Sequence, residues 1–343
     1  MKLSIIVPFY NVEKFLSDCL ESIVKLTGFE REIILINDGS SDSSLKIAKE
    51  YMKRYNIGKK PEIILVEQEN KGVAIARNEG IRRSTGEYIY FLDSDDWIET
   101  SSFNSLVLKF FEENDRLKEE ERIDVLLGKE IFYDERTKKE KILKNIPDSY
   151  LNKVISGKEF LVSSIVKRFW NVRLPIGIYK RKTIIEHGIY FSDVTKSHED
   201  ELFMTKMLYF SNKVKTVDKV FGYYRGRDGS IMSELKIQHV IDILHNIDEL
   251  KEMFKEERDV QVKSAVFGNI RRYYKEVLKK AYILEKMETF EKIYTQFRTD
   301  CKNYLFKMTK NPFEKLEIYL IYYLKDVYYN IKIGTRKMRN LMK

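Results

Sequence analysis

Three carboxylates follow an apolar run within four residues. Tyr88–Leu92 is apolar, and Asp93, Asp95 and Asp96 come directly after it. A buried strand there would deliver these side chains to a loop at its C-terminal end. So much negative charge is unfavourable unless a cation neutralises it. Mg²⁺ and Mn²⁺ prefer oxygen ligands and commonly bridge to phosphates, so the pattern predicts a metal–diphosphate site. The alternative is an acidic turn that caps the next helix.

Two earlier turns carry side chains that could contact a nucleotide. Pro8, Tyr10 and Asn11 follow the first apolar run, and Asp38 follows the second. Tyr10 could lie against a base whose edge the backbone of this turn reads, although simple packing explains the ring equally well. Asp38 could accept a hydrogen bond from a uracil imide or a ribose hydroxyl. Its alternative role is turn and cap chemistry, which Asn-Asp-Gly favours.

A glycine-opened helix and a glycine-rich loop supply candidate anion contacts. Gly72 begins a helical pattern whose first N–H groups could face an anion, and Arg77 lies about one turn further on. This is not a Walker loop, because no Gly-Lys-Ser/Thr follows at the required spacing. Arg225 and Arg227 lie among glycines in 222–233 and could close over a diphosphate. A solvated basic loop is the alternative.

Glu199 and Asp200 form a second acidic group, in the segment Ser197–Phe203. Acidic residues are favoured at the start of any helix, so an ordinary N-terminal turn also explains them. His198 could assist a reaction there, although a lone histidine is more often a surface or packing residue.

The first third of the chain alternates short apolar runs with helical periodicity. This alternation predicts a mostly parallel sheet with helices on both faces, and such sheets bind ligands beyond the carboxyl ends of their strands. All the turns described above except Glu199–Asp200 and the glycine-rich loop fall at those ends. The expected strands are 3–7, 33–36, 63–66 and 87–92, and the expected helices are 12–26, 43–55 and 72–83.

Further along, the pattern predicts strands at 124–132, 141–143, 213–217 and 220–224, and helices at 157–167 and 199–210. An irregular stretch with Trp170 and Pro175 lies between them. Beyond residue 235 the pattern is helical to the end. We therefore expect an α/β domain over 1–235, with halves 1–110 and 111–235, and a helical basic region over 236–343.

Charge is concentrated at one end of the chain. The formal net charge is +9, and residues 302–343 hold ten Lys or Arg against three acids. A nucleic-acid binder would not usually store its charge this way, so an anionic membrane surface is the leading partner for the basic end. Core packing and a dimer interface remain open there. Cys19 and Cys301 match no metal or redox spacing, which suggests a reduced cytoplasmic setting. No signal peptide and no transmembrane run are expected.

In this order, the strand-end motifs resemble those of the family-2 glycosyltransferases of GT-A fold. The similarity is close over roughly 3–105 and looser to about 235. The matching segments are Ser4–Asn11, Ile36–Asp42, Asn70–Gly72 with Ala76–Asn78, and Phe91–Trp97.

The resemblance implies a nucleotide-sugar donor, UDP-linked, a Mn²⁺ or Mg²⁺ cofactor and transfer to a saccharide hydroxyl with inversion. It implies that Asp38 and Arg77 contact the nucleotide, Asp93 the ribose or metal-linked groups, and Asp95 the metal, with Asp96 as a second contact. Asp200 would be the general base and Glu199 the runner-up. A metal-binding histidine that many relatives carry near Arg225 is absent, which leaves the third protein ligand open.

The resemblance also places the product among bacterial surface glycans such as capsule or lipooligosaccharide. The acceptor would then be lipid-linked and the chain would work at the inner face of the cytoplasmic membrane. Two rivals remain. A sugar nucleotidyltransferase should carry a Gly-rich, basic signature after the first strand, where this chain has Pro8–Asn11. A nucleotide-sugar-binding scaffold without turnover would keep the same motifs.

Overall fold

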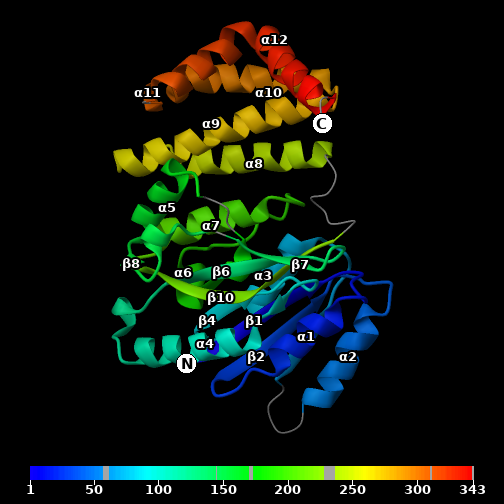
Figure 1. Cartoon of the computed structure of the whole chain (residues 1–343). Coiled ribbons are helices and arrows are strands. Elements are labelled where there is room, and N and C mark those ends of the chain that lie inside the picture. The colour runs from blue at the N-terminus through cyan, green and yellow to red at the C-terminus, as the bar shows by residue number, and fades with distance from the viewer. Residues whose placement is uncertain (57–61, 144, 170–172, 228–235, 310, 342–343) are drawn as a thin grey trace. The chain divides into compact units, whose positions relative to one another are not determined.

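A computed structural model describes the backbone of residues 1–56, 62–143, 145–169, 173–227, 236–309 and 311–341. The side chains of 326 and 330–341 are outside the described part. The chain divides into two compact units, Met1–Ser233 and Glu234–Lys343 (Figure 1). The first is an α/β unit and the second is helical, so the expected fold class is confirmed. The further division of the first unit at residue 110 stays a prediction.

The first unit is built on one mixed sheet. Its strand order is β3-β2-β1-β4-β9-β6-β10-β5, with β7 paired to β6 and β8 paired to β10. The strands from β3 to β4 run parallel, whereas β9 is antiparallel to both β4 and β6. The strands are β1 Lys2–Phe9, β2 Glu30–Asn37, β3 Ile63–Glu67, β4 Tyr88–Phe91, β5 Trp97–Ile98, β6 Val125–Asp134, β7 Lys139–Leu143, β8 Val154–Ile155, β9 Gly177–Lys180 and β10 Val214–Gly226.

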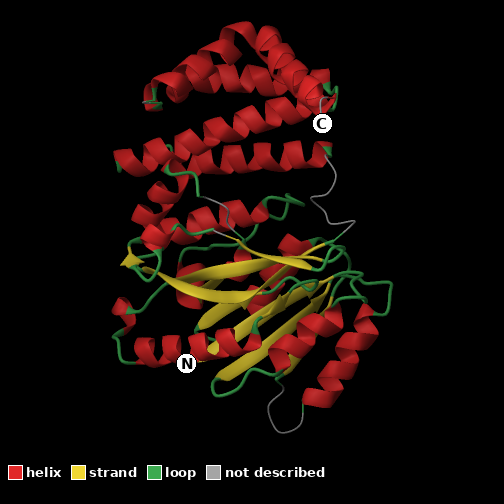
Figure 2. Ribbon diagram, in the orientation of Figure 1, coloured by secondary structure: helices red, strands yellow, loops and turns green. Residues whose placement is uncertain are grey.

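Helices cover both faces of the parallel strands (Figure 2). Side chains alternate across a strand, so Leu3, Ile5 and Val7 of β1 join a buried cluster with α1, α2 and α4, while Ile6 faces α3. Each fully buried aliphatic side chain of this kind contributes about 1.5–3 kcal/mol. The helices of this unit are α1 Leu16–Val24, α2 Ser44–Tyr55, α3 Val73–Arg83, α4 Thr100–Asp115, α5 Gly157–Val166, α6 Arg181–Glu186 and α7 Glu199–Phe210.

Strand β9 was not expected from the sequence. It lies in the stretch predicted to be irregular, of which Trp170 is outside the described residues. The strand has only four residues, and Pro175 in a 3₁₀ turn precedes it. Its strand state depends on pairing with β4 and β6 on its two sides, which local sequence does not encode. The two strands expected at 213–217 and 220–224 are one strand, β10, with register shifts between Thr216 and Gly222.

The second unit contains α8 Ile237–Phe254, α9 Val260–Ile283, α10 Met287–Asp300, a π-helical turn Cys301–Leu305, α11 Phe306–Met308 and α12 Pro312–Leu341. Helix α12 kinks at Leu324, where φ is −129° and ψ is 40°. In the described part of the chain, no helix combines the length and the apolar character needed to traverse a bilayer.

Two helical glycines give opposite expectations for the same substitution. An added Cβ at Gly80 of α3 would lie 2.3 Å from Ile6 Cγ2, whereas at Gly268 of α9 it would meet nothing within 4 Å. We expect Gly80→Ala to lower the free energy of unfolding by about 1–3 kcal/mol because α3 must move off β1. Gly268→Ala should raise it by about 0.5–1 kcal/mol through helix propensity. Urea unfolding followed by circular dichroism checks both, and a neutral Gly80→Ala would contradict the close packing of α3 on β1.

Candidate active site

A single buried guanidinium connects the two acidic motifs. Arg77, on α3, is 3% exposed. Its Nη2 donates to Asp93 Oδ1 at 2.7 Å, and its Nη1 donates to Glu199 Oε1 at 2.7 Å and to Asp200 Oδ1 at 2.9 Å. Burial disfavours the charged arginine, but the carboxylates of Asp200, Asp93 and Glu199 outweigh that effect and raise the pKa of Arg77. The cation is therefore permanent, and it binds the strand-end motif to the start of α7.

The three aspartates of the first motif have different surroundings. The side chains of Asp93 and Asp95 are 27% and 24% exposed, whereas that of Asp96 is 2% exposed. Burial opposes ionisation of Asp93, but the charges of Arg77 and Arg173 prevail and lower its pKa. Asp95 Oδ2 accepts from Arg227 Nε at 2.8 Å. Asp93 and Asp95 are therefore the members of the motif that a ligand could reach.

Asp96 belongs to the framework. Its Oδ2 accepts from Arg173 Nη2 and its Oδ1 accepts from the backbone N–H of Arg225, both at 2.8 Å. Burial raises the pKa of Asp96 well above its usual range, and the charge of Arg173 offsets only part of that rise. Both of its carboxylate oxygens hold protein donors in this structure, and a metal contact for Asp96 stays a prediction.

The side chain of Arg225 also binds protein groups of the first unit. Its guanidinium donates to Asp18 Oδ2 at 2.8 Å, to Glu135 Oε2 at 2.6 Å and to the carbonyl of Asp95 at 2.8 Å. It lies 4.4 Å from the ring centroid of Trp97. In this structure the guanidinium is occupied by these protein partners, and a donor contact for Arg225 stays a prediction. Arg227 reaches the motif aspartate instead, and the rest of the predicted loop, from residue 228, lies outside the described residues.

Asp38, in the turn after β2, binds the turn after β3, which ends at Gly72. Asp38 is 4% exposed, and its carboxylate accepts from Gln68 Nε2, from the N–H of Lys71 and from the N–H of Gly72 at 2.7–2.9 Å. The anion that the Gly72 N–H contacts in this structure is Asp38, and a donor contact at Gly72 stays a prediction. Gly72 also has φ of +94°, a conformation that favours glycine. A nucleotide contact for Asp38 stays a prediction, but the turn role is what this geometry supports.

The turn after β1 stays a candidate for the base of a nucleotide. Tyr10 is 48% exposed, while Pro8 lies within β1 beside Ile36 of β2. Asn11 has φ of +49°, and its Oδ1 accepts from the N–H of Ser41 at 2.8 Å. Asn11 therefore fixes this turn against the one after β2, and it leaves the ring of Tyr10 in solvent.

Asp200 has the charge behaviour of an acid–base group. Burial raises the pKa of Asp200 to about 7; Arg77 opposes the rise, and Glu199 and Asp93 add to it. Its side chain is 23% exposed, whereas that of Glu199 is 10% exposed. His198, which precedes α7, has a left-handed backbone with φ of 60°. Asp200 therefore combines access to solvent with a protonation state that changes near neutral pH.

Residues 4–117 match the sequence profile of the family described as Glycosyl transferase family 2. The chain carries a family-2 glycosyltransferase domain. It is similar to the glycosyltransferase GlyA of Streptococcus pneumoniae serotype 4, at 32% identity over 67% of this chain and 31% of GlyA. It is also similar to the poly(ribitol-phosphate) beta-N-acetylglucosaminyltransferase TarS of Staphylococcus aureus (strain Mu50), at 29% identity over 68% of this chain and 37% of TarS.

Solved structures share the fold of this chain. A crystal structure of S. aureus TarS 1–349 in complex with UDP-GlcNAc matches with a TM-score of 0.54 and 21% identity, over 87% of this chain and 92% of that one. The mannosyltransferase PcManGT of Pyrobaculum calidifontis, in complex with GDP-Man and Mn²⁺, matches with a TM-score of 0.55 and 13% identity, over 96% and 84%. The chain spans 31–62% of the lengths of the first curated relatives that it matches.

The donor set of the family-2 domain suits a metal that is shared with a diphosphate. In the described ranges, no group of three or more His, Cys, Asp or Glu is placed to hold a metal by itself. Mg²⁺ commonly keeps several waters and uses one or two carboxylates together with substrate phosphates. Asp93 and Asp95 fit that requirement because a single residue separates them in the motif and both side chains are partly exposed.

Sequence reasoning missed Arg173 and Glu130. Arg173 contacts Asp93, Asp96 and Glu130, at 3.5, 2.8 and 3.3 Å. Burial raises the pKa of Glu130 to about 7 despite the charge of Arg173. Arg173 lies in the stretch expected to be irregular, and Glu130 lies inside β6, so no motif or spacing marks either residue.

Two arginines of α3 allow a matched test of the buried cluster. Arg77→Met should lower the free energy of unfolding by about 3–5 kcal/mol, because three carboxylates lose their cation. Arg83→Met should change it by at most about 0.5 kcal/mol, since Arg83 is 57% exposed and, among the described residues, its one ion pair is with Glu79. Guanidinium unfolding of the two variants provides the measurement. Equal effects would show that solvent, rather than Arg77, compensates the acids.

Proposed function

We propose that this chain is an inverting, metal-dependent glycosyltransferase that moves a sugar from a nucleotide-diphosphate donor, UDP-linked, to a saccharide hydroxyl. The observation that carries the proposal is the bridge from Asp93 through Arg77 to Asp200, with 2.7 and 2.9 Å contacts. It brings the acidic motif after β4 and the acid at the start of α7 to one cation, although 107 residues separate them in the chain. A donor-binding group and an acid–base group thereby face one reaction centre.

The donor class is supported by the charges around Asp95. A divalent cation, Mn²⁺ or Mg²⁺, would be held by Asp95 with Asp93 and would neutralise the departing diphosphate. Arg227 now pairs with Asp95 at 2.8 Å, and its side chain is 24% exposed. On donor binding, Arg227 can release Asp95 and turn its guanidinium toward the diphosphate oxygens, where it stabilises leaving-group charge. TarS in complex with UDP-GlcNAc and PcManGT in complex with GDP-Man and Mn²⁺ support the same ligand classes.

Asp200 is the proposed general base. Ionised Asp200 takes the proton of the acceptor hydroxyl as the hydroxyl oxygen forms its bond to the anomeric carbon. The bond from that carbon to the diphosphate oxygen breaks on the opposite face, and the nucleoside diphosphate leaves with the electron pair. One displacement of this kind inverts the anomeric configuration. Arg77 holds Asp200 Oδ1 at 2.9 Å and so fixes the direction of the base. Asp93, held by Arg77 and Arg173, would face the ribose or the phosphates.

The proposed acceptor is a bacterial surface glycan that is built on a lipid carrier, with the chain in the cytoplasm at the inner membrane face. The similarity to TarS, a poly(ribitol-phosphate) beta-N-acetylglucosaminyltransferase, favours a second acceptor class, a polyol-phosphate polymer. Peripheral membrane contact through the basic C-terminal region belongs to the same proposal. Either acceptor class presents the hydroxyl that Asp200 requires.

Donor turnover tests the metal assignment. We expect release of UDP from one member of a UDP-sugar panel in the presence of Mn²⁺, and loss of that release with EDTA. Asp95→Asn should lower turnover by about 100-fold or more, because charge on the leaving group is then poorly compensated. Asp115→Asn, an exposed aspartate at the end of α4, is the control. Turnover that resists both EDTA and Asp95→Asn would remove the metal from the mechanism, and donor binding without any turnover would favour a scaffold protein.

The pH profile tests the base. Because the pKa of Asp200 is raised to about 7, the carboxyl holds its proton below that pH and cannot accept one from the acceptor. The value of kcat/KM should therefore rise about tenfold per pH unit below 7 and level off above it. Asp200→Asn should lower kcat by about 100-fold or more, whereas the exposed Asp193→Asn should not. A wild-type rate in Asp200→Asn would exclude Asp200 as the general base and favour Glu199 in that role.

A further inference from the structure

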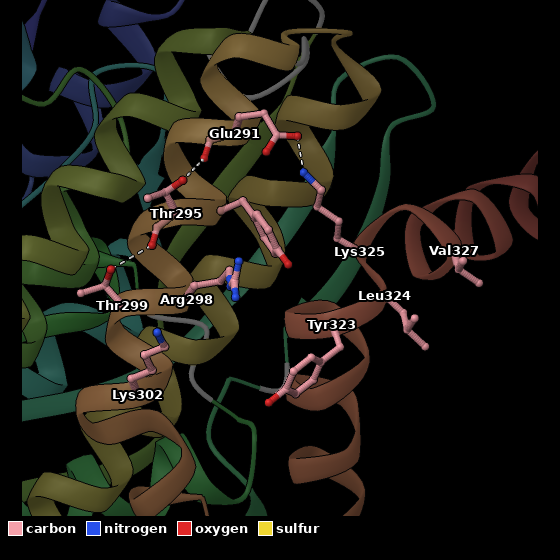
Figure 3. A pocket seen from close by; sticks show the side chains of 10 residues that line it. Glu291, Thr295, Arg298, Thr299, Lys302, Tyr323, Leu324, Lys325 and Val327 are labelled. Atoms are coloured by element: carbon pink, nitrogen blue, oxygen red, sulfur yellow. Dashed lines mark hydrogen bonds and ion pairs between the residues drawn. The ribbon is translucent and has the colours of Figure 1, made fainter.

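A pocket of about 690 Å³ lies in the second unit, between α10 and the bend of α12 (Figure 3). Three cations line it, Arg298, Lys302 and Lys325, against one acid, Glu291. We call these four residues and the space between them the cation pocket. Lys325 pairs with Glu291, whereas no carboxylate lies within ion-pair distance of Arg298 or Lys302 among the described residues. The pocket therefore carries a net positive charge.

Aromatic rings form the inner side of the cation pocket. The Cζ atom of Arg298 lies 4.6 Å from the ring centroid of Tyr322, and the Nζ atom of Lys325 lies 4.5 Å from that of Tyr294. Such contacts hold the cations on the surface while their outer faces remain able to bind anions. Tyr323, which is 61% exposed, lies at the rim of the pocket.

The adjoining surface of α12 is apolar and exposed. Phe313, Leu316, Leu320 and Tyr323 are 81%, 58%, 37% and 61% exposed and recur at spacings of three and four residues before the kink at Leu324, and Val327, which is 53% exposed, lies beyond the kink. We call these five residues the outer stripe. The other side of α12 is already used, because Ile318, Ile321, Tyr322 and Tyr329 are buried within the second unit. One helix thus presents two apolar faces, and only one of them is covered by the described chain.

Charge decides which partner suits the outer stripe. Residues 302–343 hold ten Lys or Arg against three acids, so a second copy docking here would bring two basic segments together. A bilayer with anionic lipids matches both features, since its acyl boundary accepts the apolar side chains and its phosphates accept the cations. Tyrosine and phenylalanine are also residues that lie well at the interface between lipid and water.

We propose that the outer stripe inserts into the surface of an anionic bilayer and that Arg298 and Lys302 of the cation pocket bind lipid phosphate groups. The inference gives a location to the membrane contact of the proposed function, and it does not depend on glycosyl transfer. It also explains why α12 keeps large apolar side chains in solvent on one face.

Vesicle flotation of the full chain tests this inference. The vesicles are phosphatidylcholine alone, or phosphatidylcholine and phosphatidylglycerol at three to one. We expect binding to the anionic vesicles, and a roughly 30-fold weaker partition for Arg298→Gln/Lys302→Gln, since each basic residue near such a surface contributes about 1 kcal/mol. Lys255→Gln/Lys286→Gln removes two exposed charges elsewhere in the second unit and should change the partition much less.

The apolar part has its own variants. Phe313→Ser/Leu316→Ser should weaken binding at least tenfold, whereas Val260→Ser, at an exposed residue of α9, should not. Equal binding to both vesicle types, or equal losses in the control variants, would overturn the proposal. So would a concentration-dependent dimer in light scattering that Leu316→Ser abolishes, because the stripe would then be an interface between copies. Circular dichroism and donor turnover in solution, measured on every variant, separate this failure from failure of the enzymatic proposal.

Discussion

The first unit depends on the compensation of buried charge around Arg77. Placing Asp93, Glu199 and Asp200 near one another in a largely buried region is strongly unfavourable without a cation. The guanidinium satisfies all three through two of its nitrogens, with contacts of 2.7–2.9 Å. Arg77 can do this because α3 packs closely on β1, where Gly80 leaves room for Ile6. Packing of a helix on a sheet thus fixes the position of a charge, and that charge fixes the acids of the candidate active site.

A second network holds the acidic motif from the other side. Trp97 of β5 pairs with Tyr223 of β10 and stacks on its ring at 4.8 Å, while Arg225 lies over the Trp97 ring and donates to Asp18 and Glu135. The Asp93–Trp97 turn is therefore clamped between α3 and the end of β10. Of its three aspartates, only Asp93 and Asp95 are partly exposed, and the cation that pairs with Asp95 is Arg227, whose side chain is 24% exposed. Under the proposed function, the donor would enter where Arg227 pairs with Asp95 in this structure.

The strand ends could be predicted because their signals are local. Apolar runs of four to six residues followed by polar turns mark β1 to β4, and the carboxyl ends of parallel strands must share one edge. The hydrogen-bond and ion-pair partners of the polar side chains at that edge could not be predicted. Asp38 could bind either a ligand or the turn after β3, and its partners in that turn, Gln68 and Gly72, are 30 and 34 residues away in sequence. Arg173 and Glu130 belong to no recognisable motif. Arg225 donates to Asp18, which is 207 residues away in sequence. Pairwise charge contacts of this range depend on the sheet order, which local patterns leave open.

The sequence by itself determined the α/β class, the helical C-terminal region and the residue types at the sheet edge, because hydrophobic periodicity and turn chemistry act over a few residues. Only the tertiary structure decided which aspartate is buried, which carboxylates each arginine contacts, and that β9 enters the sheet between β4 and β6. The physical reason is that the energy of a charge depends on its burial and on its nearest opposite charge. Both quantities are set by chain segments that meet only after folding.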